Sequence, residues 1–372
     1  MGKVYIVRDS YFPGTATTNR MMGFLKEFSK KGIDCDVVFF MPDFSLSHAP
    51  DLEHVRYHYY WRFLPFKNSY LRQFFYLLVY IYFFCWRVKA GDTVLLLGCD
   101  ELVPLLVKKK GVRVFHERTE HPDFAQNPLL DYNRYFEACK QLDGLFLISQ
   151  NLRDLYCSKG VEYNKIHIIN MTVDVERFLD LKKQPCEPYI AYCGSAFNNK
   201  DGVDELIKAF SIFHPFYPNV KLYIIGSTRK TSERNANLEL ISCLGVKDSI
   251  ILTGSVSADR IPQMLKNAMA LVLDRPANKQ ANYGFPTKLG EYLMTANPIV
   301  VTNVGNIGDF LTDQENAYIA EPQNPPAFAE KLKLVFSSYE EALRVGKNGY
   351  DVAIMHFNSE TEAQKILKIL GF

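Results

Sequence analysis

Short apolar runs alternate with segments of helical periodicity through the first half of the chain. Such alternation is typical of βαβ units, in which helices connect the parallel strands of a sheet. Strands are predicted at residues 4–7, 35–40, 93–97, 112–115 and 145–148. Helices are predicted at residues 17–31, 71–88, 102–109, 131–141 and 151–159. This half therefore predicts one α/β, doubly wound, Rossmann-like domain.

The alternation stops at a polar stretch and resumes in the second half. Residues 182–188 read KKQPCEP, and we place the domain linker there. Further strands are predicted at 190–193, 221–225, 250–252, 270–273 and 299–301, and further helices at 202–214, 233–244, 258–267, 287–295 and 326–336. The sequence thus predicts an N-terminal domain over residues 1–183 and a second Rossmann-like domain over residues 187–350. Residues 351–372 form a C-terminal segment, with a helix at 360–370 that is expected to pack back on the first domain.

Two α/β domains in tandem are expected to face a central cleft lined by the carboxyl ends of both sheets. The length of 372 residues is enough for two separate cores. Ligands of open parallel sheets bind at the carboxyl ends of the strands. Candidate chemistry is therefore sought in the turns that follow strands.

Charge and cysteine content narrow the classes of function. The 43 basic and 41 acidic residues leave a net charge of +2, which argues against a nucleic-acid partner. The 8 cysteines form no C-x-x-C pair and the N-terminus has no signal-like segment, so a reduced, cytoplasmic protein is expected. No two histidines stand at a zinc-like spacing with a third ligand nearby.

An uninterrupted apolar and aromatic run, FFYLLVYIYFFCW, occupies residues 74–86. It is shorter than the roughly 20 apolar residues that span a bilayer. One interpretation is a helix buried in the first domain. The other is a peripheral membrane contact through residues 57–87, because the preceding stretch YHYYWRFLPFK combines aromatic and basic residues suited to the headgroup region.

The motif NYGFPTKLGEYL, residues 282–293, carries the densest candidate chemistry. Gly284 allows close backbone approach, and Pro286 suits the first position of a helix. The amides at the start of that helix, together with Lys288, would favour a diphosphate. Glu291 lies on the same helix face and is able to accept hydrogen bonds from a ribose. The alternative is an amphipathic helix on which Lys288 and Glu291 form an exposed pair.

This motif, followed by NPIVVT at 297–302, resembles the donor-binding motif of the retaining GT-B glycosyltransferases of family 4. Members of that family usually carry two glutamates in the pattern E-x7-E. Glu291 matches the second glutamate, whereas Tyr283 stands in the position of the first, which contacts the transferred sugar in the family.

A second match, IAYCGSAFNNKDGVDELIKAF at 190–210, resembles the strand, glycine turn and lysine that open the C-terminal domain of the family. Lys200 is the expected diphosphate cation, and it is expected to share this role with Lys288 because Ser195 replaces the arginine found in many members. The donor-binding residues that the resemblance implies are Gly14, Thr15, Gly194, Lys200, Gly226, Tyr283, Gly284, Phe285, Thr287, Lys288 and Glu291.

A dense titratable group, HERTEH at 116–121, follows the strand predicted at 112–115. Such density at the carboxyl end of a strand is typical of a functional site. His116 matches a histidine that contacts the sugar near its reacting carbon in the family, so it is predicted to be catalytic. Glu117 is predicted to orient the acceptor or to hold His116.

The turn at residues 11–17 opens a helix, and Gly14 and Thr15 are expected to approach the same diphosphate. It lacks the G-x-G-x-x-G spacing of a nicotinamide site. Asp34 and Asp36 form a D-x-D pattern, but two aspartates around a buried cysteine at the start of a strand need no metal. Neither a metal nor a cofactor besides the donor substrate is expected.

The resemblance implies transfer of a hexose or similar sugar from a nucleotide diphosphate to a hydroxyl group, with retention at the anomeric carbon. The expected acceptor is a saccharide or a lipid-linked saccharide, as in cell-surface polysaccharide or glycolipid assembly at the cytoplasmic face of a membrane. Two alternatives stay open. One is a GT-B sugar-nucleotide epimerase, and the other is a non-catalytic member that binds a nucleotide sugar.

Overall fold

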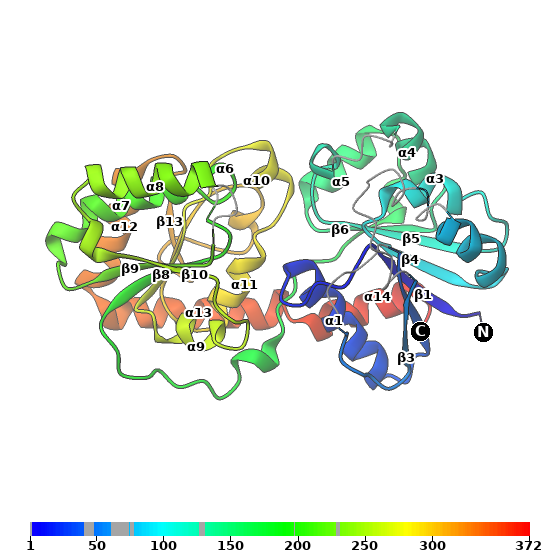
Figure 1. Ribbon diagram of the computed structural model, residues 1–372, viewed down its shortest axis with the longest axis horizontal. Coiled ribbons are helices and arrows are strands. Elements are labelled where there is room, and N and C mark those ends of the chain that lie inside the picture. The colour runs from blue at the N-terminus through cyan, green and yellow to red at the C-terminus, as the bar shows by residue number, and fades with distance from the viewer. Residues whose placement is uncertain are drawn as a thin grey trace. The chain divides into compact units, whose positions relative to one another are not determined.

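The computed structural model describes residues 2–40, 48–60, 74, 78–125, 131–196, 198–227 and 231–372. The chain forms two compact units, one of Met1–Asn170 with Ser359–Phe372 and one of Met171–Asn358 (Figure 1). The division lies upstream of the linker predicted at 182–188, and the second unit continues past residue 350. The chain passes between the units twice, near residue 170 and near residue 358. Val173 donates a backbone hydrogen bond of 2.8 Å to the carbonyl of Phe357, so the segments next to both passages are bonded to each other within unit 2.

Parallel strands in the order β3-β2-β1-β4-β5-β6-β7 form the sheet of unit 1 in the described part of the chain. They are β1 (Val4–Arg8), β2 (Cys35–Phe39), β3 (Val55–Tyr59), β4 (Thr93–Leu97), β5 (Arg113–Arg118), β6 (Gly144–Leu147) and β7 (Ile166–Ile168). The helices of this unit include α1 (Ala16–Lys30), α3 (Val103–Leu106), α4 (Tyr132–Cys139), α5 (Gln150–Ser158) and α14 (Ser359–Leu370). The predicted doubly wound fold is confirmed, and the strand order reverses between β1 and β4.

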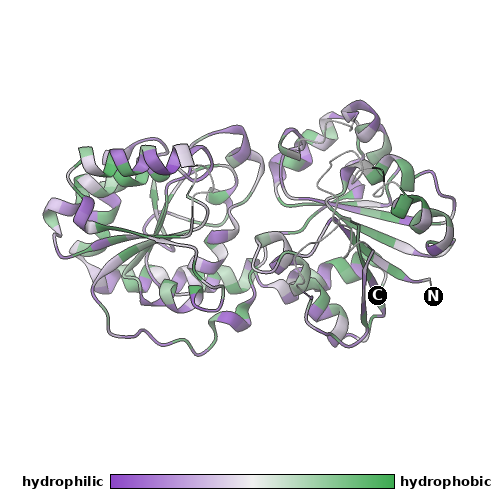
Figure 2. Cartoon of the chain, viewed as in Figure 1, coloured by the Kyte–Doolittle hydropathy of each residue, from purple (hydrophilic) through white to green (hydrophobic). Residues whose placement is uncertain are grey.

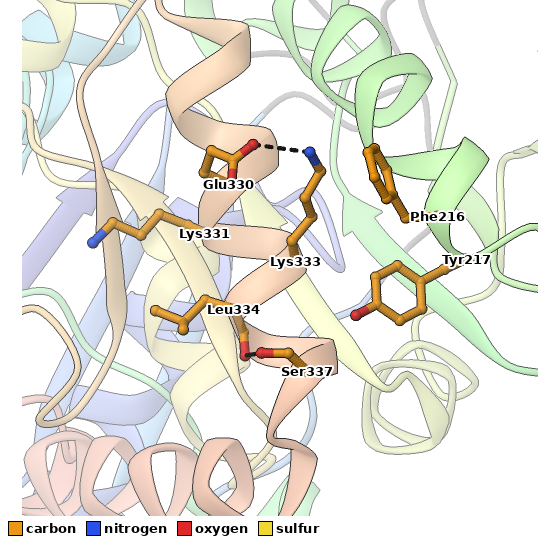
Figure 3. A pocket seen from close by; sticks show the side chains of 7 residues that line it. All are labelled: Phe216, Tyr217, Glu330, Lys331, Lys333, Leu334 and Ser337. Carbon is orange, nitrogen blue, oxygen red and sulfur yellow. Dashed lines mark hydrogen bonds and ion pairs between the residues drawn. The ribbon is translucent and has the colours of Figure 1, made fainter.

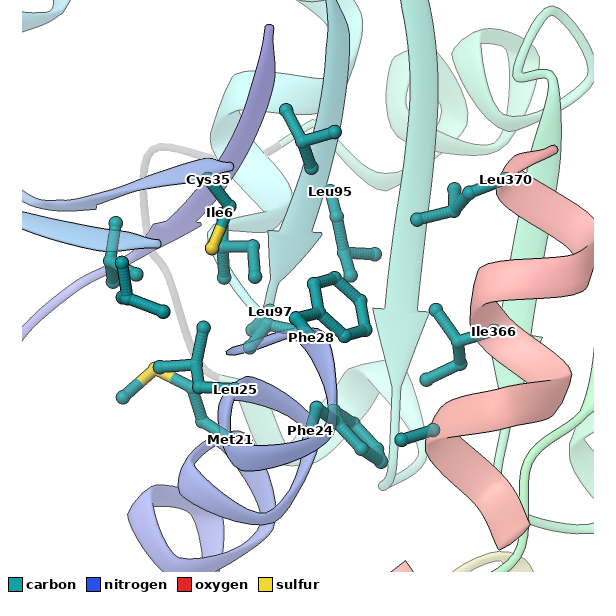
Figure 4. Packing of buried hydrophobic residues seen from close by; sticks show 14 of the residues in the cluster. Ile6, Met21, Phe24, Leu25, Phe28, Cys35, Leu95, Leu97, Ile366 and Leu370 are labelled. Atoms are coloured by element: carbon teal, nitrogen blue, oxygen red, sulfur yellow. The ribbon is translucent and has the colours of Figure 1, made fainter. Parts of the chain in front are cut away.

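The C-terminal helix α14 packs on α1 within unit 1 (Figure 4). Its residues Ile366 and Leu370 belong to the same buried cluster as Phe24 and Phe28 of α1. The two helices approach closely where α14 begins, because a Cβ atom on Gly23 would lie 2.8 Å from the Cβ atom of Ser359. The final segment of the chain thus completes the core of the first unit.

The described part of the apolar run, residues 74 and 78–86, has a buried face and an exposed face. Residues 78–82 are α-helical and continue into a π-helical turn, Phe83–Arg87. Val79, Tyr80 and Phe83 are buried, and the ring of Phe83 packs edge-on against Tyr5. Leu78, Ile81, Tyr82 and Trp86 are exposed. The run is therefore neither wholly buried nor wholly exposed, and no helix in the described residues is long and apolar enough to cross a membrane.

Residues 57–59, which the sequence analysis assigned to a membrane contact, are part of the edge strand β3. The rings of Tyr57 and Tyr59 stack on Phe39 of the neighbouring strand β2. These aromatic side chains are half-buried and pack within the unit, and a membrane contact by this part of the stretch stays a prediction. Residues 61–67 of the same stretch lie outside the described residues.

Unit 2 contains a second parallel sheet, in the order β10-β9-β8-β11-β12-β13 among the described residues. The strands are β8 (Tyr189–Cys193), β9 (Lys221–Ile225), β10 (Ile250–Gly254), β11 (Ala270–Leu273), β12 (Ile299–Thr302) and β13 (Tyr318–Ala320). The helices are α6 (Asn198–Asp201), α7 (Val203–Phe213), α8 (Thr231–Cys243), α9 (Ile261–Asn267), α10 (Lys279–Tyr283), α11 (Thr287–Leu293), α12 (Pro325–Ser337) and α13 (Tyr339–His356). Strand order reverses between β8 and β11, so a ligand of this sheet is expected beside the carboxyl ends of these two strands.

In both units the central strands are apolar, while the helices carry apolar and polar flanks (Figure 2). This pattern reflects a parallel sheet covered on both faces, whose strands are buried on each side. Every residue of β4, β8 and β12 is buried.

Candidate functional site

Glycine residues end three neighbouring strands of unit 2. Gly194 follows β8 with φ 155°, Gly226 follows β9 with φ 127°, and Gly254 ends β10 with φ 68°. A Cβ atom on Gly226 would lie only 2.1 Å from the carbonyl oxygen of Gly194. The backbones of Gly194 and Gly226 are therefore packed too closely for a side chain on Gly226, which leaves a surface of main-chain atoms at the carboxyl end of the sheet.

Lys288 of α11 lies across this glycine surface. A Cβ atom on Gly194 would lie 1.9 Å from Lys288 Cε, so the glycine makes room for the lysine. The Lys288 ammonium forms an ion pair of 2.8 Å with the buried Asp201 carboxylate. Tyr192 donates a 2.8 Å hydrogen bond to the same carboxylate oxygen, and the lysine lies over its ring at 5.6 Å. Burial, followed by the charge of Asp201, raises the pKa of Tyr192 well above 10, which keeps the phenol as a donor.

Glu291 lies one turn along the helix from Lys288 and has a different partner. Its carboxylate forms an ion pair with Arg177, which comes from the 3-10 turn Val175–Phe178. Arg177 also donates a 3.2 Å hydrogen bond to the carbonyl of Ala258. Both side chains of the pair are 24% exposed, so the carboxylate is held while part of it faces solvent. The alternative in which Lys288 and Glu291 form an exposed pair with each other is therefore not what the structure contains.

The residues before α11 have mixed roles. Tyr283 is half-buried at the end of α10, and Gly284 follows with φ −95°, a value that does not require glycine. Phe285 is buried against Phe310, with ring centroids 5.5 Å apart, which is a core contact. Pro286 is the N-cap residue rather than the first helical residue, and Thr287 begins the helix.

Lys200 lies in α6, directly before the Asp201 that holds Lys288. Its carbonyl oxygen accepts a 3.4 Å hydrogen bond from Arg275 Nε. Arg275 directly follows β11. This contact therefore joins α6 to the end of β11, one of the two strands between which the strand order reverses. The structure thus places Gly194, Gly226, Lys288, Glu291 and the helix that contains Lys200 in unit 2, and their role in binding a donor stays a prediction.

Asp274, directly after β11, is a buried acid that the sequence analysis missed. It is 1% exposed, and its Oδ2 atom has no hydrogen-bond partner among the described residues. Burial, followed by the nearby charges of Glu205 and Asp204, raises the pKa of Asp274 to about 8. Its carboxyl group is therefore largely protonated at neutral pH. Its position directly after the predicted strand at 270–273 is the sequence feature from which this residue could have been chosen as a candidate.

His116 of β5 lies inside unit 1 and has no exposed surface. Its Nε2 atom is 3.1 Å from the hydroxyl of Tyr135 and 3.1 Å from Asp100 Oδ1. Arg118 forms a 2.7 Å ion pair with the other oxygen of Asp100. Hydrogen bonding from His116 and the charge of Arg118 outweigh burial and hold the pKa of Asp100 below its usual value. The predicted catalytic histidine is thus part of a buried polar network.

Glu117 faces the other side of the strand and does not contact His116 in this structure. It forms a 2.9 Å ion pair with the buried Arg20 of α1. Arg20 also donates a 3.0 Å hydrogen bond to the carbonyl of Ile169 and another to that of Asn170. The prediction that Glu117 holds His116 is therefore wrong, because successive side chains of a strand point to opposite faces. Asp100 occupies that position instead.

Gly14 and Thr15 form the turn between β1 and α1. Gly14 has φ 76°, and Thr15 is the N-cap residue of the helix. The Thr15 hydroxyl accepts a 3.4 Å hydrogen bond from the Thr18 amide and donates a 2.9 Å one to the Phe12 carbonyl. These contacts explain the turn locally, and its role toward a ligand stays a prediction.

The D-x-D aspartates have basic partners. Asp36 is buried and contacts Arg56 at 2.7 Å and His58 at 3.2 Å, while Asp34 contacts His54 at 3.0 Å. Burial acts to raise the pKa of Asp36, but hydrogen bonds from Arg56 and His58 bring it below its usual value. The described residues contain no group of three or more His, Cys, Asp or Glu side chains that could hold a metal.

A separate open cavity of about 450 Å³ lies near the C-terminal end of α12 (Figure 3). It is lined by Phe216, Tyr217, Glu330, Lys331, Lys333, Leu334 and Ser337. Phe216 and Tyr217 precede β9, so the cavity belongs to the amino end of the sheet and contains none of the predicted donor residues.

The two Rossmann-like units have the GT-B fold. Solved structures with the same fold include HepE of Anabaena in complex with UDP and glucose, with a TM-score of 0.73 and 13% identity over 100% of this chain and 99% of that one. The fold is also shared with TarM of S. aureus in complex with UDP and α-GlcNAc-glycerol, with a TM-score of 0.77 and 13% identity over 100% of both chains.

Residues 177–352 match the family model described as glycosyl transferases group 1, and this part of the chain is similar to that family. The capsular polysaccharide biosynthesis glycosyltransferase CapM of Staphylococcus aureus is 27% identical over 205 residues, which cover 55% of this chain and 50% of CapM. An uncharacterized glycosyltransferase of Methanocaldococcus jannaschii, MJ1607, is 24% identical over 224 residues, which cover 56% of this chain and 54% of the relative. The chain thus spans about half the length of the curated relatives that it matches.

Proposed function

We propose that this chain transfers a sugar from a nucleotide-diphosphate sugar to a hydroxyl group of an acceptor, with retention at the anomeric carbon. The observation that carries the proposal is the position of Lys288, fixed by Asp201 over the backbone of Gly194 at the switch point of unit 2. A cation held over close-packed main-chain atoms suits a diphosphate, because no side chain keeps the phosphates away.

Glu291 extends this assignment to the nucleoside. Its carboxylate lies one helical turn from Lys288, and Arg177 binds one of its oxygens. The second oxygen is then the natural acceptor for the hydroxyl groups of a ribose attached to the diphosphate. Lys200 and Lys288 would neutralise the diphosphate, and we propose that the reaction needs no bound metal.

In the proposed reaction the bond between the anomeric carbon and the diphosphate oxygen breaks. The acceptor oxygen bonds to the same face of the sugar, and its proton passes to the leaving phosphate. The protein then contributes orientation and stabilisation of the charge that develops on the diphosphate. We assign the stabilisation of that charge to Lys288. His116 and Glu117 remain predictions for the sugar and the acceptor.

We further propose a hexose or similar sugar as the transferred group and a saccharide or lipid-linked saccharide as the acceptor. The similarity to CapM, which is named for capsular polysaccharide biosynthesis, supports a place in cell-surface polysaccharide or glycolipid assembly. Such a reaction would occur at the cytoplasmic face of a membrane, where nucleotide sugars are available.

Thermal unfolding with UDP-, GDP- and ADP-sugars tests the donor assignment. A ligand that binds only the folded state raises the melting temperature. The nucleotide sugar that gives the largest increase is the best candidate for the donor. Lys288→Ala and Glu291→Ala should each lose most of this shift. Lys247→Ala, which removes an exposed lysine elsewhere in unit 2, should keep it. Unchanged nucleotide affinity in folded Lys288→Ala and Glu291→Ala proteins would refute the proposal.

Activity assays separate the remaining alternatives. Release of nucleotide diphosphate that depends on an added acceptor, and that persists in EDTA, supports metal-independent transfer. Isomerisation of the sugar nucleotide without an acceptor would instead indicate an epimerase. Donor binding without release under any condition would indicate a non-catalytic member, an alternative suggested by Tyr283.

A further inference from the structure

Four large apolar side chains lie exposed on one face of the helical residues 78–86 in the described part of unit 1. Leu78 is 41% exposed, Ile81 41%, Tyr82 43% and Trp86 67%. Ile81 and Tyr82 lie three and four residues after Leu78, so all three share a helix face. The rings of Tyr82 and Trp86 lie 5.8 Å apart, which extends this face into the π-helical turn.

The core of unit 1 does not need this outward face. The opposite side of the same helix supplies the core contacts through Val79, Tyr80 and Phe83, all buried. Phe83 packs edge-on against Phe40, with ring centroids 5.3 Å apart. Four exposed apolar side chains in one place therefore indicate an interaction surface rather than an incompletely packed core.

Basic residues lie in the segments that follow and contact this helix. The ammonium of Lys109 lies 4.6 Å from the ring centroid of Phe84 and donates a hydrogen bond to its carbonyl. A backbone hydrogen bond of 2.7 Å from Gly91 to Gly111 brings the loops 87–92 and 107–113 together. These loops contain Arg87, Lys89, Lys108, Lys109, Lys110 and Arg113, and their one acidic residue, Asp92, is only 6% exposed.

We propose that this face of unit 1 docks on an anionic lipid surface. We name it the docking face and define it by Leu78, Ile81, Tyr82, Trp86 and the exposed lysines Lys89, Lys108 and Lys110. Aromatic rings at the headgroup level, flanked by lysines, fit a bilayer surface rich in negatively charged lipids. The side chains are too few to span a bilayer, so the contact is peripheral.

Charge also argues against a second copy of this chain as the occupant. A twofold contact places the same surface on both partners, so the lysine loops would be brought toward each other. An anionic surface complements them instead. The inference does not rest on the donor chemistry, so its failure would leave the proposed function intact.

Vesicle flotation tests the docking face. The full chain is mixed with phosphatidylcholine vesicles, with or without phosphatidylglycerol, at low and at high ionic strength. Wild-type protein should float with the anionic vesicles at low salt, and binding should weaken with neutral lipid and with high salt. Tyr82→Ser with Trp86→Ser should lower the bound fraction by at least about tenfold, because the aromatic anchors are lost.

Matched controls distinguish binding through the docking face from nonspecific adsorption to vesicles. Lys108→Glu with Lys110→Glu should abolish binding to anionic vesicles through repulsion. Phe216→Ser changes an aromatic residue that is 62% exposed in unit 2, and it should float like the wild type. Far-UV circular dichroism and melting temperatures confirm that each variant is folded.

Three outcomes would overturn the proposal. The first is wild-type protein that stays at the bottom of the gradient with anionic vesicles at low salt. The second is flotation of both double variants at the wild-type level. The third is a dimer, seen by light scattering without vesicles, that the Tyr82→Ser and Trp86→Ser pair dissociates, since this would assign the face to a second copy of the chain.

Discussion

Lys288 and Asp201 form a 2.8 Å ion pair that holds the lysine ammonium over the backbone of Gly194. Asp201 is 2% exposed and also accepts a hydrogen bond from Tyr192, so its carboxylate is fixed from two directions. A lysine side chain normally loses considerable rotamer freedom when it binds a ligand. Here much of that loss has occurred before any ligand arrives.

Replacing Gly194 by alanine should displace Lys288 from this position. The new Cβ atom would fall 1.9 Å from Lys288 Cε, and the φ of 155° disfavours a side chain as well. We expect the Kd for the nucleotide diphosphate to rise by about 10- to 100-fold, since a charge-assisted hydrogen bond is lost. Isothermal titration calorimetry measures the change.

Gly254→Ala distinguishes the steric clash with Lys288 from the backbone strain that a side chain causes at a positive φ. Gly254 also has a positive φ, of 68°, but a Cβ atom there would meet nothing within 4 Å. The variant should bind nucleotide nearly as well as the wild type. In the Lys288→Ala background, Gly194→Ala should add little, because the same contact is already lost. Equal losses in Gly194→Ala and Gly254→Ala would contradict this explanation.

Arg177 should act as a positioning residue for Glu291. Arg177→Ala frees the carboxylate from its partner, and we expect nucleotide affinity to fall about three- to tenfold, because the carboxylate is no longer oriented. Arg177→Lys should restore part of the affinity. In the Glu291→Ala background the Arg177→Ala change should have almost no effect, which a purely structural role would not produce. Tighter binding by Arg177→Ala would show instead that the arginine competes with the ligand.

The pair Arg177 and Glu291 also marks the limit of what the sequence could predict. Lys288 and Glu291 stand three residues apart in one helix, so their pattern was visible in the sequence. Their partners are distant, since Asp201 lies 87 positions from Lys288 and Arg177 lies 114 positions from Glu291. Only the parallel order of β8 and β11 brings these residues together, and no local pattern specifies such contacts.

The same reasoning applies to the fold. Strands such as β4 and β11 are short runs of mainly apolar residues, and the ends predicted from the sequence agree with those in the structure. The strand β3 reads VRYHY and was missed, because polar residues alternate with aromatic ones at this edge of the sheet. The helix α13, Tyr339–His356, was missed as well. It connects α12 to the segment where the chain returns to unit 1 at Ser359.

Asp274 should make unit 2 less stable as the pH rises. Its pKa is raised from 3.8 to about 8 by burial and by the nearby Glu205 and Asp204, so the folded state binds its proton more tightly than the unfolded state does. Stability from this group is therefore fully present below about pH 4 and is lost as the pH rises toward 8.

Asp274→Asn should remove this loss, because the amide stays neutral. We expect the variant to be more stable than the wild type at pH 8 to 9 by a few kcal/mol, since about 1.4 kcal/mol corresponds to each pKa unit. The difference should shrink as the pH falls toward 4. Melting curves across this range measure it, with Asp248→Asn as a surface control. A pH-independent difference would contradict the assignment.

His116 provides a test of whether a buried residue takes part in the reaction. Its imidazole has no exposed surface and contacts Tyr135 and Asp100, each at 3.1 Å. His116→Ala should therefore lower the stability of unit 1 by about 2–4 kcal/mol, because Asp100 and Tyr135 lose a buried polar partner. Nucleotide affinity, which the proposal assigns to unit 2, should stay unchanged in the folded variant. If His116→Ala instead keeps the wild-type melting temperature and loses turnover, the histidine contacts the sugar, as the family resemblance implies. Turnover, melting temperature and nucleotide Kd measured on one preparation decide between these roles.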